Sequence, residues 1–188
     1  MLRTALWVVV GLFPVSEIAL AILKRADSRS ARIEDRGSMR LVWVAVALGI
    51  ACALAAQWVT SARLRLPGGV VRGLALACLV SGLVIRWASI VTLGRHFTVD
   101  VAIQQDHVLV QHGLYRLVRH PSYSGLLLAF LGMGLVYGNW LSLIAVMAPV
   151  TLAVMNRIAK EEQALHVALG PPYAAYCART KRLFPGLI

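Results

Sequence analysis

A dense run of polar and ionisable side chains lies in residues 107–125 of this sequence. It contains His107, Tyr115, Arg119, His120 and Tyr123. Pro121 stands where a long apolar stretch begins, and proline suits the first turn of a helix because its missing N–H would be unpaired there. The free N–H groups and the dipole of such a helix start favour an anion, for example a ligand carboxylate. We expect His120 and the helix start to face one polar pocket; the alternative is an ordinary helix start with a basic anchor at the lipid headgroups.

A second cluster begins where a later apolar stretch ends. Arg157 and Glu161 are four residues apart, so a helix would place them on the same face. An exposed ion pair of this kind contributes well under about 1 kcal/mol, and a plain surface pair is one interpretation. The other is a functional site, because the pair lies at the boundary of an apolar stretch in a chain with only 8 acidic residues.

The whole chain is far more apolar than a soluble domain. Of its 188 residues, 59% are hydrophobic and 14% are charged, and the mean hydropathy is +0.73. Soluble domains are about 45–50% apolar and about 25% charged. Since one membrane span needs roughly 20 apolar residues, the composition predicts an integral membrane protein with several spans.

Five apolar runs divide the chain. They are Ala5–Leu23, Leu41–Val59, Val70–Leu93, Ser122–Tyr137 and Trp140–Met155. Only Gly138 and Asn139 separate the last two, which predicts a tight helical hairpin. We therefore predict an all-α integral membrane protein with five transmembrane helices. It would form a single domain over residues 1–188, with three spans in residues 1–93 and the candidate catalytic half, including a cytoplasmic-side pocket, in residues 94–188.

The basic residues lie in the breaks between the apolar runs. The break at residues 24–40 holds more lysine and arginine than acid, which places it in the cytoplasm by the positive-inside rule. Five crossings then put the N-terminus outside and the C-terminus in the cytoplasm. The net charge of +11 is thus assigned to topology and not to nucleic acid, because no basic stripe with interleaved aromatic residues is present. A cleaved signal peptide is the alternative interpretation of the first run.

Two ionisable residues, Glu17 and Arg86, lie inside predicted spans. Charges at that depth usually face protein or a water-filled cavity, so one interpretation puts them on a substrate path. The other is a paired or snorkelling residue near a helix end. The three cysteines lack CxxC spacing, so neither a zinc site nor a disulfide framework is predicted and no metal is expected.

Weaker patterns flank the two clusters. Apolar residues alternate from Phe97 to Ile103, which predicts a short extended stretch or hairpin on the membrane surface. In the tail, apolar and aromatic residues repeat at helical spacing as far as Tyr176, but Gly170-Pro171-Pro172 interrupts them. We expect two short C-terminal helices that fold back as a lid on the membrane surface, with Tyr173 and Tyr176 packing rather than binding a ligand.

The two clusters together resemble the isoprenylcysteine carboxyl methyltransferase family of membrane enzymes. The residues that carry the resemblance are Gly113, Tyr115, Arg119, His120, Pro121, Tyr123 and Gly125, then Arg157, Glu161, Glu162 and Leu165, and then Gly170, Tyr173 and Tyr176. The resemblance covers roughly residues 94–185. It implies a helical membrane fold that binds S-adenosylmethionine at its cytoplasmic face.

The resemblance also implies roles for individual residues. The cofactor site would comprise His107, Val108, Leu109, Val110, Gly113, Tyr115, His120, Pro121, Ser122, Tyr123 and Glu161. Arg157 would bind the substrate and act in catalysis. Glu162 is the second candidate catalytic residue, from the chemistry of the reaction and not from the resemblance. Asp100 stands where eukaryotic members carry a glutamine that contacts the cofactor, so this chain departs from the family pattern there.

The implied methyl acceptor is a lipophilic small molecule or a prenylated substrate that enters from the bilayer lipids. A carboxylate acceptor is ionised at neutral pH and needs no base, whereas an amine or thiol would need a proton acceptor, for which Glu162 is the nearest candidate. Two other functions remain open: a membrane reductase of the sterol-reductase type that binds NADPH, and a non-catalytic membrane binding protein. The sequence predicts no oligomeric state.

Overall fold

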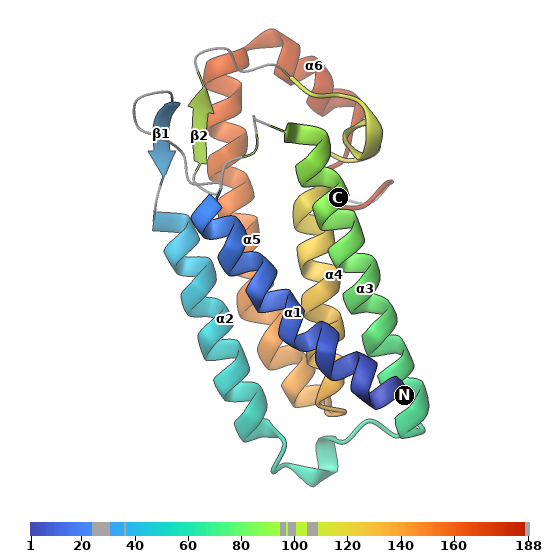
Figure 1. Ribbon diagram of the computed structural model, residues 1–188. Coiled ribbons are helices and arrows are strands. Elements are labelled where there is room, and N and C mark those ends of the chain that lie inside the picture. Colours follow the sequence, from blue (N-terminus) through green and yellow to red (C-terminus); the bar gives the residue numbers. More distant parts are fainter. Residues whose placement is uncertain (24–30, 36, 95–96, 98–100, 105–108, 187–188) are drawn as a thin grey trace.

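The structure, a computed structural model, describes residues 1–23, 31–35, 37–94, 97, 101–104 and 109–186. The elements in chain order are α1 (Leu2–Leu23), β1 (Ala31–Asp35), α2 (Gly37–Ala56), the 3-10 helix η1 (Thr60–Ala62), α3 (Gly68–Leu93), β2 (Val101–Gln104), the 3-10 helix η3 (Gly113–Arg116), α4 (Pro121–Val136), α5 (Trp140–Leu169) and α6 (Pro171–Arg179). The long helices form an elongated bundle that α1 crosses diagonally (Figure 1). Three residues singled out in the sequence, Asp100, His107 and Val108, lie outside the described residues.

Four helices of the described chain, α1, α2, α3 and α5, are long and apolar enough to cross a membrane. The remaining apolar helix, α4, has 16 residues, which is fewer than the roughly 20 that a span at right angles to the bilayer requires. The predicted class, a helical multi-pass membrane protein, is therefore confirmed in this coarse form.

The last long helix extends beyond its apolar run. That run ends at Met155, whereas α5 continues to Leu169 and has 30 residues. Residues 156–169 contain neither glycine nor proline, so the helical hydrogen bonds continue until Gly170, whose φ of +57° ends the helix. The first of the two short C-terminal helices expected from the sequence is thus the end of α5. The second is α6, which begins with Pro171 and Pro172 in its first turn.

A two-stranded antiparallel sheet departs from the all-α prediction. β2 lies in the extended stretch expected after Phe97, and it pairs with β1 in the connection between α1 and α2, with Ala31 opposite Gln104. The partner strand comes from a distant part of the sequence. Alternation of apolar residues within one segment indicates an extended backbone but not the strand with which it pairs.

Glycines bring α3 and α4 into close contact. A Cβ atom added at Gly82 would lie 2.5 Å from the backbone nitrogen of Ala129, and one at Gly125 would lie 2.6 Å from the backbone nitrogen of Arg86. Gly49 similarly allows α2 to approach Ala145 of α5. Small residues let membrane helices pack at short range without a cavity, and this packing fixes the position of α4 beside α3.

The two chemical clusters meet at one end of the bundle. Figure 1 shows the start of α4, the last turns of α5, helix α6 and the β1–β2 sheet together at that end. Asn139 caps the start of α5 at the other end, where its side chain accepts hydrogen bonds from the backbone of Leu141 and Ser142. The short connection from α4 to α5 therefore lies away from the clusters, and the two helices run back past each other.

Candidate functional site

The start of α4 is tied to the C-terminal tail by backbone hydrogen bonds. Arg119 N donates to Lys181 O at 2.8 Å, and His120 N donates to Arg182 O at 2.9 Å. The Oγ of Ser124, one turn into the helix, donates to Leu183 O at 2.6 Å. The tail after α6 thus lies along the first turn of α4, and it closes one side of the cluster.

Tyr123 connects the two predicted parts of the site. Its hydroxyl donates to Glu161 Oε2 at 2.8 Å and accepts a hydrogen bond from Arg157 Nε at 2.7 Å. His120 Nδ1 lies 4.0 Å from Glu161 Oε1. Residues from the start of α4 and the exit of α5 therefore form one continuous cluster. Arg157 and Glu161, expected on one helix face, are joined through the tyrosine hydroxyl.

The two adjacent glutamates have different surroundings. The side chain of Glu161 is 31% exposed to solvent. Its Oε1 atom faces His120, and its Oε2 atom accepts a hydrogen bond from the Tyr123 hydroxyl. A partly exposed carboxylate of this kind can still accept hydrogen bonds from a cationic ligand group. Glu161 is thus the acid of the cluster that remains available to a ligand.

Glu162 is surrounded by basic side chains. Its Oε1 accepts from Arg119 Nε at 2.9 Å and lies 3.3 Å from His120 Nε2. Its Oε2 accepts from Arg182 Nε at 2.9 Å and lies 2.7 Å from Arg182 Nη2. The hydrogen bond to this carboxylate raises the pKa of Arg182. Because both oxygens are already engaged, the geometry argues against the predicted role of Glu162 as a proton acceptor. Its contacts instead join α4, α5 and the tail.

Arg157 is buried, with 3% exposure, and reaches a third helix. Its Nη1 donates to Ser38 Oγ at 3.0 Å. Ser38 lies at the start of α2 and is also buried. The sequence analysis did not single out Ser38, and a lone serine at the edge of an apolar run carries no signal that would have identified it.

Other residues predicted to bind the cofactor have structural contacts. Tyr115 is buried, its Oη donates to Ser89 O of α3, and its carbonyl accepts from Tyr176 Oη at 2.6 Å. Burial raises the pKa of Tyr176 to about 12. These bonds dock α6 and η3 against the end of α3, as expected for a packing tyrosine in the tail.

The remaining predicted residues lie around this cluster. Leu109 and Val110 are half-buried, and Gly113 has a φ of +60° and packs beside Thr92. Pro121 is fully buried in the first turn of α4. The hydroxyl of Tyr173 is buried and has no hydrogen-bond partner among the described residues, and burial raises the pKa of this tyrosine.

The intramembrane charges Glu17 and Arg86 form a pair. Arg86 Nη2 donates to Glu17 Oε2 at 2.5 Å, and Arg86 Nε donates to Glu17 Oε1. Arg86 Nη1 also donates to Ser122 Oγ at 3.0 Å. Of the two interpretations left open by the sequence, the structure supports the paired one. Ser122, predicted to bind the cofactor, has its hydroxyl turned toward Arg86.

The fold and this cluster define a multi-pass helical membrane protein with an Arg–Tyr–Glu hydrogen-bond chain at one end of its helices. Residues 75–167 match the model of the isoprenylcysteine carboxyl methyltransferase (ICMT) family. The match places these residues, just under half of the chain, within that family. The match includes α4, nearly all of α5 and the residues of the cluster except Ser38 and the C-terminal tail.

Individual relatives agree with this assignment. The chain is 38% identical over 103 residues to protein-S-isoprenylcysteine O-methyltransferase A of Arabidopsis thaliana, covering 54% of this chain and 52% of that protein. It is 35% identical over 112 residues to a probable protein-S-isoprenylcysteine O-methyltransferase of Oryza sativa subsp. indica, covering 58% and 59%. The chain thus spans somewhat more than half the length of these curated relatives.

A solved membrane enzyme shares the fold. The structure of the eukaryotic intramembrane Ras methyltransferase ICMT is similar to this chain with a TM-score of 0.59 and 25% sequence identity. The similarity covers 77% of this chain and 52% of that chain. It therefore extends beyond residues 75–167 into helices for which the sequence offered little besides hydropathy.

Proposed function

We propose that the protein is a membrane methyltransferase that transfers a methyl group from S-adenosylmethionine to the carboxylate of a lipophilic acceptor, such as a prenylcysteine. The observation that carries this proposal is the position of Tyr123, whose hydroxyl bridges Arg157 and Glu161. The bridge brings a basic group and a partly exposed acid together at one end of the bundle. The names of the family and of the relatives support the same activity.

The residues present fit S-adenosylmethionine in kind. This cofactor has an amino acid group, a sulfonium and an adenosine, and when bound it supplies the activated methyl group. The partly exposed Glu161 can accept hydrogen bonds from the ammonium group. The ring of Tyr123 provides an aromatic surface beside it. The Nε2 atom of His120 contacts Glu162. His120 therefore joins the start of α4 to α5 and orients Glu161 and Glu162.

Arg157 would orient the acceptor. A buried guanidinium pairs strongly with a carboxylate, since both groups have lost water. The acceptor carboxylate is already ionised at neutral pH, so the reaction needs no proton acceptor, and the engaged state of Glu162 is compatible with it. Catalysis would then rest on in-line placement of the two reactants and on exclusion of water from the charges that disappear in the transition state.

The membrane orientation follows from charge and length. We assign α4 as a fifth span. Its 16 residues cover about 24 Å at 1.5 Å per residue. The neighbouring helices α3 and α5 are longer and shield its ends. The positive-inside rule then places the cluster in the cytoplasm and the N-terminus outside. The cofactor would enter from the cytoplasm and the acceptor from the bilayer.

Calorimetric titration of the purified protein with S-adenosylmethionine and, separately, with NADPH tests this function. Heat with the first ligand and none with the second is the expected result. Arg157→Ala should retain cofactor binding and lose transfer of labelled methyl to a prenylcysteine carboxylate. Gln163→Ala, an exposed neighbour on α5, is the control and should change neither. Heat with NADPH alone, or with neither ligand, would overturn the proposal.

A further inference from the structure

We infer that the C-terminal tail and the segment before α4 form a surface that binds the anionic headgroups of membrane lipids, and that this binding holds the tail against the candidate site. The tail comprises residues 180–186, and the segment before α4 comprises η3 and residues 117–120. The effect on the site rests on the proposed function, whereas the lipid surface rests on the positions and charges of its own residues.

The lipid surface lies where the helices leave the bilayer. α5 begins at Trp140, and Arg157 follows by 17 residues, which is about 26 Å along the helix and close to the roughly 30 Å of a bilayer core. Arg157 contacts Tyr123 in the first turn of α4. The start of α4 and the segments beside it therefore lie at the boundary between hydrocarbon and water.

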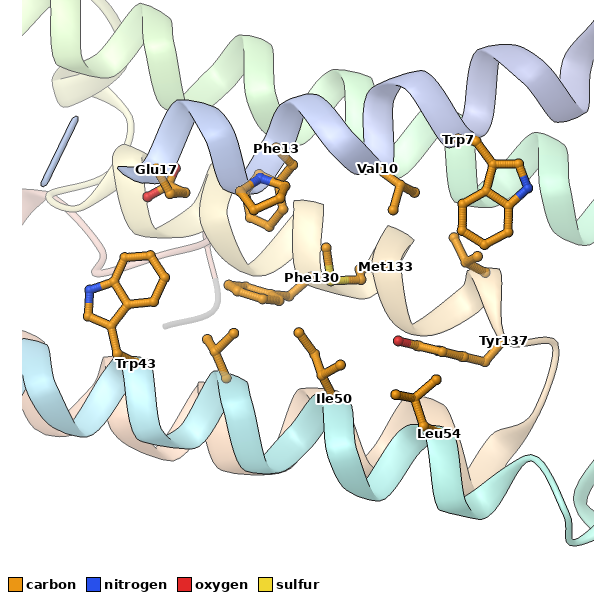
Figure 2. A pocket seen from close by; sticks show the side chains of 13 residues that line it. Trp7, Val10, Phe13, Glu17, Trp43, Ile50, Leu54, Phe130, Met133 and Tyr137 are labelled. Atoms are coloured by element: carbon orange, nitrogen blue, oxygen red, sulfur yellow. The ribbon is translucent and has the colours of Figure 1, made fainter. Parts of the chain in front are cut away.

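Exposed tryptophans agree with this level. An apolar pocket lies between α1, α2 and α4, and Figure 2 shows Trp43 at one end of it and Trp7 at the other. Trp43 marks the end nearest the candidate site, because it follows Ser38, the contact of Arg157, by five residues on α2. Tryptophan favours the boundary between the hydrocarbon and the headgroups, so the site end of the bundle reaches the headgroups.

The lipid surface combines exposed apolar and basic side chains. Leu117 and Phe184 are 55% and 45% exposed. Arg116 and Lys181 are exposed as well, and neither forms an ion pair with an acid among the residues that the structure describes. The two segments are neighbours, because Val118 and Lys181 form a parallel bridge. Basic side chains beside apolar ones are typical of elements that lie in a membrane interface.

The tail descends along α4 toward the bilayer. Arg119 N donates to Lys181 O just before the helix begins. Ser124 Oγ donates to Leu183 O one turn inside the helix. The next residue, Phe184, therefore lies nearer to the hydrocarbon, and Lys181 lies nearer to the headgroups. A free phosphate ion would account for the basic side chains only, whereas a lipid accounts for both kinds and for their order in depth.

The charge of this surface favours acidic lipids. The glutamates beside the tail are turned toward the cluster, since Glu162 is buried and Glu161 accepts from Tyr123. They therefore do not offset the exposed basic charge. Each lysine or arginine close to an anionic leaflet is worth about fivefold in affinity. A neutral headgroup such as phosphatidylcholine offers no such attraction.

Lipid binding at this surface would stabilise the docked tail. The tail supplies Arg182, whose guanidinium donates to Glu162, and its backbone accepts from Arg119 and His120. His120 faces Glu161, the acid proposed to bind the ammonium group of the cofactor. Acidic lipids should therefore raise the affinity for S-adenosylmethionine.

Native mass spectrometry of the delipidated protein with phosphatidylglycerol and, separately, with phosphatidylcholine tests the surface. The wild type should bind phosphatidylglycerol more tightly. Arg116→Gln combined with Lys181→Gln should weaken that binding by up to about thirtyfold. Arg63→Gln combined with Arg65→Gln is the matched control and should bind as the wild type, because it removes the same charge from exposed residues at the Asn139 end of the bundle.

Soluble anions distinguish a lipid from a free phosphate. Inorganic phosphate and glycerol 3-phosphate should not displace the bound lipid, because they lack the acyl chains that would lie against Leu117 and Phe184. Displacement by either compound would overturn the lipid assignment. Equal binding of the two lipids by the wild type, or equal losses in the two double variants, would overturn it as well.

Calorimetry in nanodiscs measures the effect on the site. S-adenosylmethionine should bind more tightly in nanodiscs that contain phosphatidylglycerol than in phosphatidylcholine alone, and the difference should vanish in the variant with Arg116→Gln and Lys181→Gln. Equal affinity in both membranes would overturn the coupling between the surface and the site. Failure of S-adenosylmethionine to bind in either membrane would count against the proposed function, whereas the lipid preference in mass spectrometry would still decide whether the surface binds acidic lipids.

Discussion

Arg157 on α5 donates a hydrogen bond from Nη1 to the Oγ of Ser38 on α2, at 3.0 Å. Through this bond α2, a helix outside the family match, contacts Arg157, for which we propose a role in orienting the acceptor. The same guanidinium donates from Nε to Tyr123 on α4. Three helices thus hold one arginine, and two hydroxyl groups define the direction of its side chain.

Ser38→Ala should lower the rate of methyl transfer without weakening cofactor binding. A hydrogen bond to a charged group contributes about 1.5–3 kcal/mol, so kcat should fall roughly tenfold or more. Ser81→Ala provides a control, because Ser81 is exposed and donates to carbonyls of its own helix. Measuring kcat together with the dissociation constant of S-adenosylmethionine separates the two effects. Equal losses in both would mean that Ser38 supports the whole fold and does not specifically position Arg157.

Substitution of the two adjacent glutamates should separate binding from stability. Glu161→Gln should weaken S-adenosylmethionine binding with little change in the melting temperature, because Glu161 is partly exposed. Glu162→Gln should lower the free energy of unfolding by about 3 kcal/mol or more, since it removes the charge that pairs with Arg119, His120 and Arg182. Calorimetry and thermal unfolding in detergent measure the two quantities. The assignment would be wrong if Glu162→Gln left the protein stable and abolished binding alone.

Gly82→Ala should destabilise the bundle. The added Cβ would lie 2.5 Å from Ala129 N and 2.6 Å from Gly125 O, and both are backbone atoms that cannot move without separating α3 from α4. Overpacking of this kind costs about 1–3 kcal/mol. Gly73→Ala is a matched control on the same helix, where the new methyl group would meet nothing within 4 Å. Thermal unfolding of the two variants should therefore differ by several degrees, with Gly82→Ala the lower.

The ion pair between Glu17 and Arg86 should behave as a coupled unit. Glu17→Gln leaves a buried guanidinium without its counter-charge and should cost about 3 kcal/mol or more in the free energy of unfolding. The double variant Glu17→Gln with Arg86→Met should be less destabilised than the sum of the two single variants, because no charge then remains buried. Arg72→Met, at an exposed arginine of α3, controls for loss of positive charge. Additive single effects would show that the two residues do not interact in the membrane.

The sequence alone was sufficient for the class of protein and for the two clusters. Long apolar runs predict spans because the bilayer core requires apolar side chains and internally satisfied backbones. The helix start at Pro121 followed from the chemistry of proline, which has no N–H to lose in a first turn. Both features depend on residues that are neighbours in the chain.

Contacts between distant segments could not be predicted in this way. The pairing of β1 with β2 and the engagement of Glu162 by Arg182 depend on which segments meet in space. The sequence placed Glu161 and Glu162 side by side, and nothing local distinguishes two adjacent acids. Only the packed tail surrounds one of them with basic groups and leaves the other partly exposed.

The same contrast between local and long-range determinants holds for the Ser38–Arg157 contact and for the apolar pocket between α1, α2 and α4. Hydropathy and spacing determined that the chain lies in a membrane and that Arg157 and Glu161 share a helix face. The tertiary structure decided that Ser38 contacts Arg157 and that α1, α2 and α4 leave space between them. Local backbone preference and hydrophobicity act over a few residues, whereas burial, pairing of charges and the shape of a cavity arise only when helices far apart in the chain are packed together.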